Sequence, residues 1–328
     1  MAAIEGRKTD RVPVGGLITS ITTEMMESTG VYWPDAHIDP QSMGRLAEAA
    51  YKDYGLESIK IPFDMVVEAQ ALGANINLGN RDTFPQVSRA PFEDPRELTI
   101  PADYFRRGRF PVVFRAIEDL RSRYDGEVSI VSSIVGPFSL AGILFGIRNF
   151  YIWLKRKPQL YSQAMEHSLH IATQYAQKQR EAGADIVQIG EALASGDMIS
   201  GSTYKESVAP YHERLCREME FPNFLHICGD VTDRVQYIRE VPTDGFSFDE
   251  KANIKTLVEI LKGDLALIGY VPTNLLLNGS PEEVKDYSLE CLENGVDILN
   301  AGCSLSPHTP SENVKAMVEA RDYSSRGT

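Results

Sequence analysis

Eight short apolar segments, separated by longer segments with helical spacing, are the feature that most constrains the fold of this 328-residue chain. The short segments are rich in β-branched residues and apolar on both faces, as is typical of parallel strands covered by helices. They lie at residues 12–19, 58–63, 128–136, 184–191, 224–229, 245–250, 265–271 and 296–303. Strand and helix alternating eight times predicts an α/β protein built as a (β/α)8 TIM barrel.

The longer segments carry clear helix signals. The segment from Pro158 consists largely of helix-forming residues, and the segment from Ser280 has proline at its first helical position and closes at Gly295. An open doubly wound sheet is the rival architecture. It normally has a glycine-rich phosphate-binding loop after the first strand, and "GGLITSITTE" is not G-x-G-x-x-G. The barrel is therefore favoured.

One connection is too long for a simple loop between a strand and a helix. Residues 64–109 follow the second predicted strand and contain "GANINLGNRDTFPQVSRAPFEDP", which is rich in turn-forming residues. We interpret this segment as an insertion, with a hairpin that walls or covers the barrel mouth. Because no polar linker or repeat divides the chain, we expect residues 1–328 to form a single domain.

The charge balance limits the kinds of partner. Lys and Arg total 33 against 46 for Asp and Glu, a formal net charge of −13, which disfavours nucleic acid and anionic membranes. No segment reaches the roughly 18 apolar residues of a membrane span, and no signal peptide is recognisable, so we expect a cytoplasmic protein. Four cysteines in a chain of this length do not indicate a disulfide framework. The oligomeric state is not indicated.

Metal-competent side chains follow several of the predicted strands at their carboxyl ends. In a TIM barrel these ends form one rim, and the chemistry takes place there. The candidates at this rim are Glu191, His226, Cys228, Asp249 and Cys303. We therefore expect all five to lie around one opening.

His226 and Cys228 are the strongest metal candidates. Residues i and i+2 of a strand point the same way, so the two side chains can bind one ion together. Cys303 lies 75 residues further along but on the same predicted rim. Two cysteines and one histidine are a ligand set of open catalytic zinc sites. Lone buried cysteines are more often small core side chains, and we assign that role to Cys216 and Cys291.

Several other candidate residues have ordinary structural roles as an alternative to metal binding or catalysis. Glu191 and Asp249 could hold backbone amides as strand-end carboxylates. His308 could be an extra ligand, but a loop position ahead of a helix near Pro310 is favoured. Three histidines on predicted helices are expected to be exposed or internally hydrogen-bonded: His167, His170 and His212.

Several motifs in the sequence resemble those of a known family. "LHICGD" followed by "LNAGCSLSPHTPSENVKAMVEA", with "DRVPV" near the start and "ADIVQIGEALASGDMIS" in the middle, resembles the zinc-dependent methylcobamide:coenzyme M methyltransferases of the uroporphyrinogen decarboxylase superfamily. The resemblance covers nearly the whole chain. It implies that His226, Cys228 and Cys303 hold Zn²⁺ and that Asp249 can fill the fourth position when substrate is absent. The family commonly has Asp-Pro where Glu191-Ala192 stands, which leaves the role of Glu191 open.

The resemblance also implies a reaction. A methyl group would move from a methylated corrinoid, carried by a transiently bound corrinoid protein, to a zinc-activated thiol such as coenzyme M, with Glu191 and Asp249 as catalytic candidates. Three alternatives stay open: transfer in the opposite direction from a methyl donor to the corrinoid, a structural zinc in a scaffold, and a metal-free decarboxylase. Decarboxylation of a porphyrinogen is disfavoured because "VPVGGLITSITTEMM" lacks the arginines of the porphyrin-binding motif.

Overall fold

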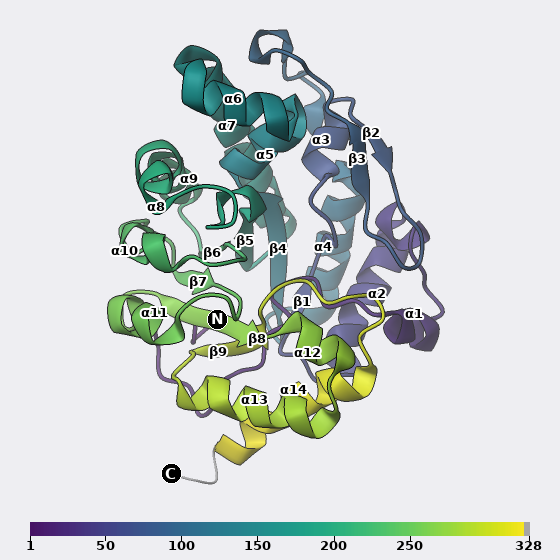
Figure 1. The fold of residues 1–328 in the computed structure, drawn as a ribbon. Coiled ribbons are helices and arrows are strands. Elements are labelled where there is room, and N and C mark those ends of the chain that lie inside the picture. The colour runs from purple at the N-terminus through teal and green to yellow at the C-terminus, as the bar shows by residue number, and fades with distance from the viewer. Residues whose placement is uncertain (325–328) are drawn as a thin grey trace.

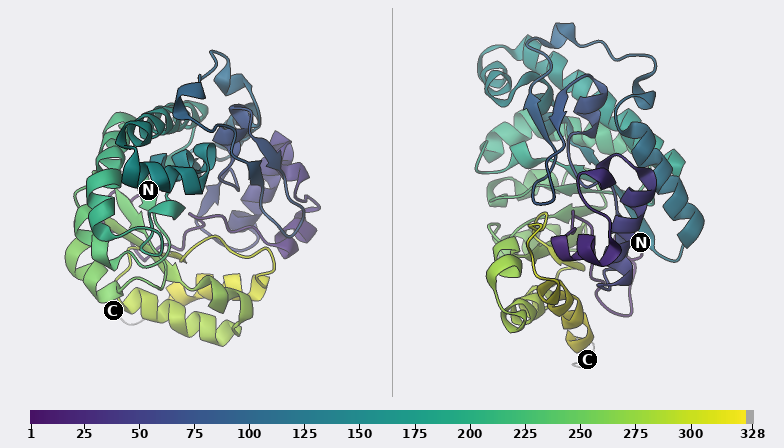
Figure 2. Two further views of the ribbon diagram at one scale, coloured as in Figure 1. Left: turned by 45° about the horizontal axis from the view of Figure 1, so that its top comes forward. Right: turned by 90° about the vertical axis from the view of Figure 1, so that its right-hand side faces the viewer.

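A curled sheet of seven parallel strands forms the centre of the fold, and helices surround it (Figures 1 and 2). The computed structural model describes residues 1–324. The order in the sheet is β1-β4-β5-β6-β7-β8-β9, so each strand pairs with the next strand of the sheet along the chain. The strands are β1 (Ser58–Lys60), β4 (Ser129–Val135), β5 (Ile186–Gly190), β6 (Asn223–His226), β7 (Gly245–Ser247), β8 (Ala266–Val271) and β9 (Ile298–Ala301).

Fourteen α-helices are described in residues 1–324, most of them between successive strands of the sheet. They are α1 (Thr23–Thr29), α2 (Pro40–Lys52), α3 (Val67–Ala71), α4 (Phe110–Tyr124), α5 (Pro137–Phe145), α6 (Ile147–Arg156), α7 (Pro158–Ala182), α8 (Gly201–Thr203), α9 (Ala209–Met219), α10 (Val235–Ile238), α11 (Ile254–Leu261), α12 (Thr273–Asn278), α13 (Pro281–Glu293) and α14 (Ser311–Ser324). No single helix in this part of the chain is both long and apolar enough to cross a membrane, although α5 and α6, bent by 114° at their junction, reach that length and composition as a pair.

Local signals explain where the two clearest helices begin and end. Ser280 and Glu283 form a capping box at the start of α13, as the Ser-Pro-Glu-Glu sequence favours. Pro158 begins α7, and Gly183 ends it in the left-handed conformation that glycine adopts without strain. Both predicted helices are confirmed. The Ser280 side chain at the start of α13 and the Gly183 N–H at the end of α7 pair with backbone groups that the helix itself leaves unpaired.

The first predicted strand, residues 12–19, is wrong as a strand. Only Val14 forms a bridge, with Leu299 of β9. Beyond it, the backbone N–H of Gly16 donates to the Ser58 hydroxyl, and that of Leu17 donates to the Asn300 side chain. Backbone pairing with β9 is therefore limited to Pro13–Gly15, side chains accept from the next two amides, and no continuous strand forms. The segment still closes the gap between the sheet edges, because Glu57 N donates to the Val14 carbonyl.

The hairpin predicted within residues 64–109 is present, as the antiparallel strands β2 (Asn75–Asn77) and β3 (Gln86–Arg89) beside α3 (Figure 1). Its turn contacts two other parts of the fold. Arg81 forms an ion pair with Glu27 of α1, and Asp82 lies 3.5 Å from His308, in the loop after β9. That the segment is an insertion stays a prediction.

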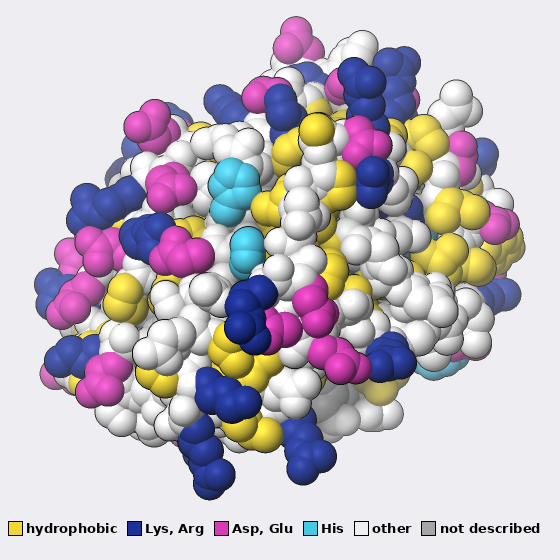
Figure 3. Space-filling model, turned by 90° about the horizontal axis from the view of Figure 1, so that it is seen from above, with side chains coloured by type: hydrophobic (Ala, Val, Ile, Leu, Met, Phe, Trp, Pro, Cys, Tyr) yellow, Lys and Arg dark blue, Asp and Glu magenta, His cyan; other side chains and the backbone are white. Residues whose placement is uncertain are grey.

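The helix-covered face of the sheet and its inner face bury separate apolar clusters. Along β4, β5 and β6, the inner positions Val131, Ile186 and Phe224 pack with the N-terminal residues Ala3 and Ile4. Most buried apolar residues belong to the larger cluster between sheet and helices. On the outer surface, basic and acidic side chains are interspersed, with apolar side chains between them, on the face seen in Figure 3.

Candidate metal centre

The inner positions of the strands change from apolar to polar towards their carboxyl ends. On β6, Phe224 belongs to the inner apolar cluster, whereas His226 at the end of the strand and Cys228 just after it line a cavity. The same change occurs from Ile186 to Gln188 on β5. Alternate residues of a strand share a face. The inner face of these two strands is therefore apolar towards the amino ends and polar towards the carboxyl ends.

These polar groups border a cavity of about 280 Å³ at the carboxyl ends of the strands. His226, Cys228 and Cys303 lie on its wall. Other parts of the wall come from β1, β4 and β5, and from Phe84, Pro85 and Gln86 of the β2–β3 hairpin. The hairpin therefore shapes the cavity, as its predicted position suggested.

The three predicted metal ligands converge. One ligand atom from each of His226, Cys228 and Cys303 lies within 4.8 Å of the other two. His226 ends β6, and Cys303 follows β9, so the curled sheet brings together residues that are far apart in the chain. A bound divalent ion needs ligand atoms at this kind of spacing, and the donor set suits zinc.

His226 is held in the form that a metal requires. Its side chain is buried, and its Nδ1 lies 3.1 Å from the hydroxyl of Ser247 on β7. Burial lowers the pKa of His226 to about 4, so the imidazole is neutral at neutral pH. With Nδ1 engaged by Ser247, Nε2 is the available donor atom. Such a contact to the other ring nitrogen is what orients histidine ligands in metal sites.

The thiols of Cys228 and Cys303 shift each other's pKa in opposite directions. A hydrogen bond between the thiols lowers the pKa of Cys228 and, with burial, raises that of Cys303 well above its usual range. Both side chains are only partly buried. A divalent ion would hold both sulfurs as thiolates, because a metal-bound thiol is deprotonated. The two remaining cysteines, Cys216 and Cys291, are buried on α9 and α13 as predicted.

Asp249 lies beside the three ligands but is not one of the converging group in residues 1–324. Its Oδ2 accepts a hydrogen bond from Gly229 N at 2.6 Å, and its Oδ1 accepts one from Lys251 N at 3.0 Å. Gly229 directly follows Cys228 and has a φ of 81°, a conformation that favours glycine. In this geometry Asp249 fixes the turn that presents Cys228.

Glu191 borders the cavity, but its carboxylate is completely buried and turned to the protein. Oε1 accepts from Phe138 N at 2.9 Å, and Oε2 accepts from both the amide and the hydroxyl of Ser139. These amides lie in the first turn of α5, where a carboxylate is favoured by the helix dipole. His212 Nε2 lies 3.1 Å away. This geometry matches a strand-end carboxylate that holds backbone amides.

The other histidines occupy ordinary positions. His212 is buried, and its Nδ1 lies 3.0 Å from the Tyr204 hydroxyl, so it is internally hydrogen-bonded. His170 is exposed on α7, and His167 is partly buried there. His308 is exposed in the loop ahead of α14 and lies outside the converging group.

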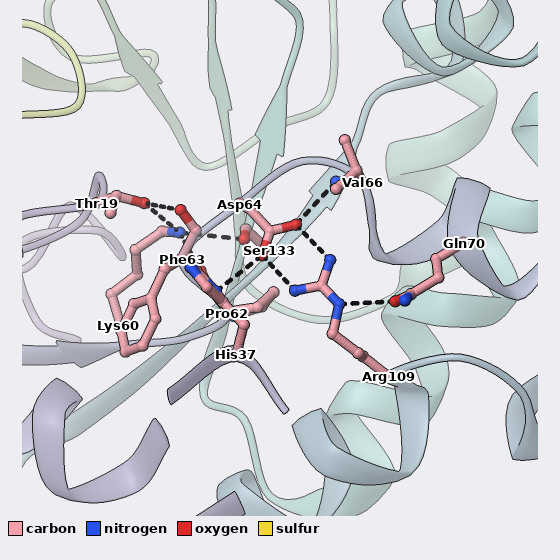
Figure 4. Close-up of polar contacts among 10 residues, drawn as sticks. All are labelled: Thr19, His37, Lys60, Pro62, Phe63, Asp64, Val66, Gln70, Arg109 and Ser133. Carbon is pink, nitrogen blue, oxygen red and sulfur yellow. Dashed lines mark hydrogen bonds and ion pairs between the residues drawn. The ribbon is translucent and has the colours of Figure 1, made fainter. Parts of the chain in front are cut away.

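Sequence reasoning missed a buried polar cluster on β1 and the segment after it. Figure 4 shows Asp64 facing Arg109, whose guanidinium donates two hydrogen bonds to it at 2.6 and 2.9 Å, and His37 lies 3.3 Å away. Burial alone would raise the pKa of Asp64, but Arg109 holds it well below its usual range. The ion pair between Asp64 and Arg109 joins the two ends of the segment 64–109. The signal was a charged residue in the apolar run "SIKIPFD", whose Lys60 and Asp64 both line the cavity.

Comparisons with known proteins agree with this arrangement. Residues 1–323 match the family described as uroporphyrinogen decarboxylase (URO-D). A methylcobamide:CoM methyltransferase of Methanosarcina barkeri is 35% identical over 327 residues, which cover 98% of this chain and 96% of that protein. A methylated-thiol–coenzyme M methyltransferase of Methanosarcina mazei is also 35% identical, covering 98% of this chain and 87% of that protein.

Solved structures support the same relationship. A methyltransferase from Methanosarcina mazei has a TM-score of 0.95 and 34% identity, covering 98% of this chain and 96% of that chain. A B12-independent methionine synthase from Shewanella has a TM-score of 0.66 at 12% identity, a likeness of fold alone.

Proposed function

Because this chain belongs to the uroporphyrinogen decarboxylase (URO-D) family, we propose that it is a zinc-dependent methyltransferase of the corrinoid type within that family. It would transfer a methyl group from a methylated corrinoid protein to a thiol such as coenzyme M. The observation that carries the proposal is the convergence of His226, Cys228 and Cys303 within 4.8 Å on a cavity wall. Relatives named methylcobamide:CoM methyltransferases, which cover almost the whole chain, support it.

The residues present fit a zinc ion. His226 is neutral and oriented by Ser247, and two cysteines supply thiolates, which together form the three-ligand set of an open site. When bound, Zn²⁺ would keep a substrate thiol deprotonated at neutral pH, where a free alkyl thiol is mostly protonated. Two protein thiolates balance the charge of the ion, so the substrate sulfur stays electron-rich and nucleophilic.

The size of the cavity indicates how the methyl donor arrives. A corrinoid is several times larger than a cavity of about 280 Å³, so it would stay on its own protein and present the methyl group at the opening. The small thiol alone would enter. We propose that this contact is modest and transient, since the same corrinoid protein must return to another methyltransferase to be methylated again.

A direct assay tests the proposal. The metal-loaded protein is mixed anaerobically with methylcobalamin and coenzyme M, and the cobalt spectrum is followed. In the expected reaction the thiolate sulfur bonds to the methyl carbon, the carbon–cobalt bond breaks, and its electron pair leaves on cobalt as cob(I)alamin; the thiol proton goes to solvent. Absence of any thiol-dependent demethylation would contradict the proposed direction and would favour methylation of the corrinoid from another donor.

Asp249→Asn tests the role of the carboxylate next to the metal ligands. Asparagine offers one acceptor oxygen in place of two, so either Gly229 N or Lys251 N loses its partner and the Cys228 turn loosens. We expect metal affinity to fall by about 10-fold, as for other groups that orient metal ligands. Competition with a chelator measures the affinity. Asp286→Asn, at an exposed position of α13, is the matched control and should leave the affinity unchanged.

A different outcome would support the role that the family resemblance implies for Asp249. If Asp249→Asn loses metal in the absence of thiol and regains normal affinity when coenzyme M is added, the carboxylate is a direct fourth ligand that substrate displaces. Unchanged affinity with and without thiol would contradict both roles.

A further inference from the structure

A surface groove of about 1000 Å³ lies between α6 and the segment that follows β5, and it shares no lining residue with the cavity of the three converging ligands. One wall is α6, and the other is formed by residues of the segment 197–207. Helices α5 and α6 follow the carboxyl end of β4, and the second wall follows the carboxyl end of β5. This groove, which we call the α6 groove, is therefore at the same end of the sheet as the metal ligands.

Exposed apolar side chains gather at the α6 groove. Seven large apolar side chains are exposed in residues 1–324, and two of them line the groove from opposite walls: Ile152, 40% exposed, and Met198, 44% exposed. A third, Ile147, is 46% exposed at the start of α6, and a fourth, Met65, lines the neighbouring cavity. Single exposed apolar residues are ordinary, but a cluster of them marks a contact surface.

Basic side chains without partners accompany these apolar residues. Three of them line the groove, and none forms an ion pair or a side-chain hydrogen bond with another residue in 1–324: Arg148, Lys155 and Arg156. Of the two carboxylates on its walls, Asp197 is paired with Lys251 at 3.0 Å, which leaves Glu206. The whole chain has a formal net charge of −13, so a basic surface here is contrary to the overall balance. Its charge is complementary to that of an acidic partner.

The groove is held in a fixed position relative to the metal ligands. The Tyr151 hydroxyl donates to the Leu193 carbonyl at 3.0 Å, which joins α6 to the segment after β5. Gly196 N in turn donates to the carbonyl of Asp230 at 2.9 Å, two residues after Cys228. The two segments approach so closely that a Cβ on Gly196 would overlap this carbonyl. A protein bound in the groove would therefore have a defined position with respect to Cys228.

We propose that the α6 groove is a docking surface for the corrinoid protein, which contributes an acidic segment that carries apolar side chains. This inference rests on the proposed function and names a contact surface for its partner. Methyl transfer needs the methyl carbon in line with the thiolate, and a displacement of about 1 Å can cost about 100-fold in rate. Anchoring in the groove would supply that alignment, and charges at its rim would keep the encounter fast and reversible.

Transfer from two methyl donors tests the docking surface. The corrinoid proteins of the cells that produce this protein are purified by their visible absorbance, reduced and methylated with iodomethane. Each is compared with free methylcobalamin as the donor to coenzyme M, with the metal-loaded protein as the enzyme. We expect Arg148→Glu/Lys155→Glu to lower kcat/KM with a corrinoid protein by about 10- to 100-fold at low ionic strength. With free methylcobalamin the value should be unchanged, because these residues do not border the cavity.

Matched variants separate charge from apolar contact. Lys8→Glu/Arg45→Glu reverses two exposed charges outside the groove and should leave transfer from the corrinoid protein unchanged. Added salt should slow that transfer in the original protein but not in Arg148→Glu/Lys155→Glu, because salt screens exposed charges. Ile152→Ser should lower kcat/KM about 5-fold at every salt concentration, since burial of apolar area is not screened. Free methylcobalamin should again show no change.

Binding measured by calorimetry separates this inference from the proposed function. If a corrinoid protein binds the original protein and binds Arg148→Glu/Lys155→Glu more weakly, the docking surface is supported even when no thiol is methylated, a result that would contradict the proposed function alone. Equal affinity for the two proteins, no binding of any of the corrinoid proteins, or an equal loss of transfer from free methylcobalamin would overturn the docking surface. So would binding to phosphatidylglycerol vesicles that only the original protein shows, with transfer from the corrinoid protein unaffected, because the groove would then serve an anionic membrane.

Discussion

Replacing Cys303 with alanine is expected to abolish both stoichiometric metal binding and thiol-dependent demethylation of methylcobalamin. The substitution removes one of three ligand atoms that lie within 4.8 Å of one another, leaving a histidine and one cysteine. Loss of groups that merely orient ligands lowers metal affinity by about 10- to 100-fold, so loss of a ligand should cost about 100-fold or more. Elemental analysis measures the metal content, and the cobalt spectrum measures the rate.

A matched control and a stability measurement make this prediction specific. Cys216→Ala removes a thiol that is buried on α9 and away from the cavity, and metal content should stay at one ion per chain. A metal that serves the structure alone would give a different pattern: Cys303→Ala would mainly lower the thermal denaturation temperature. Retention of a full equivalent of tightly bound metal in Cys303→Ala would contradict the proposed site.

Glu191→Ala is expected to lower the free energy of unfolding by about 3–5 kcal/mol, the usual cost of removing one partner from a buried charged pair or network. The change leaves the amides of Phe138 and Ser139 without their acceptor at the start of α5, and removes the partner of His212. Gly136 reflects the same packing, because a Cβ there would overlap the Glu191 carboxylate. Denaturation by urea measures the change.

The comparison with an exposed glutamate separates structure from catalysis. Glu259→Ala, on the exposed side of α11, should change the unfolding free energy by no more than about 0.5 kcal/mol. If Glu191→Ala kept its stability and lost only the methyl-transfer rate, Glu191 would act in the reaction, as its position at the predicted rim first suggested. For Glu191→Ala we expect a loss of stability together with a loss of helicity in α5.

Much of the fold was predictable because hydrophobic pattern is a local property. Seven of the eight predicted strands overlap a strand of the parallel sheet, and the helices from Pro158 and Ser280 begin where their prolines and caps indicated. The failure of the first predicted strand to form was not predictable in this way. Residues 12–19 have the composition of a strand, but Ser58 and Asn300 capture the backbone amides that a continuous ladder needs. Those competing side chains come from distant positions, so local pattern does not reveal them.

Some features of the candidate site were likewise predictable from the sequence, and others were not. The sequence by itself determined the kinds of donor atom and the strand ends that carry them, because alternation along a strand and the shared rim of a parallel barrel follow from the order of the segments. Only the tertiary structure decided which polar groups face the cavity and which are used up elsewhere. Asp249 and Glu191 hold backbone amides. Lys60 lines the cavity and donates to neutral oxygens, without a carboxylate partner among the described residues. Whether a polar group is satisfied depends on neighbours brought in from other strands, and this information exists only once the chain has folded.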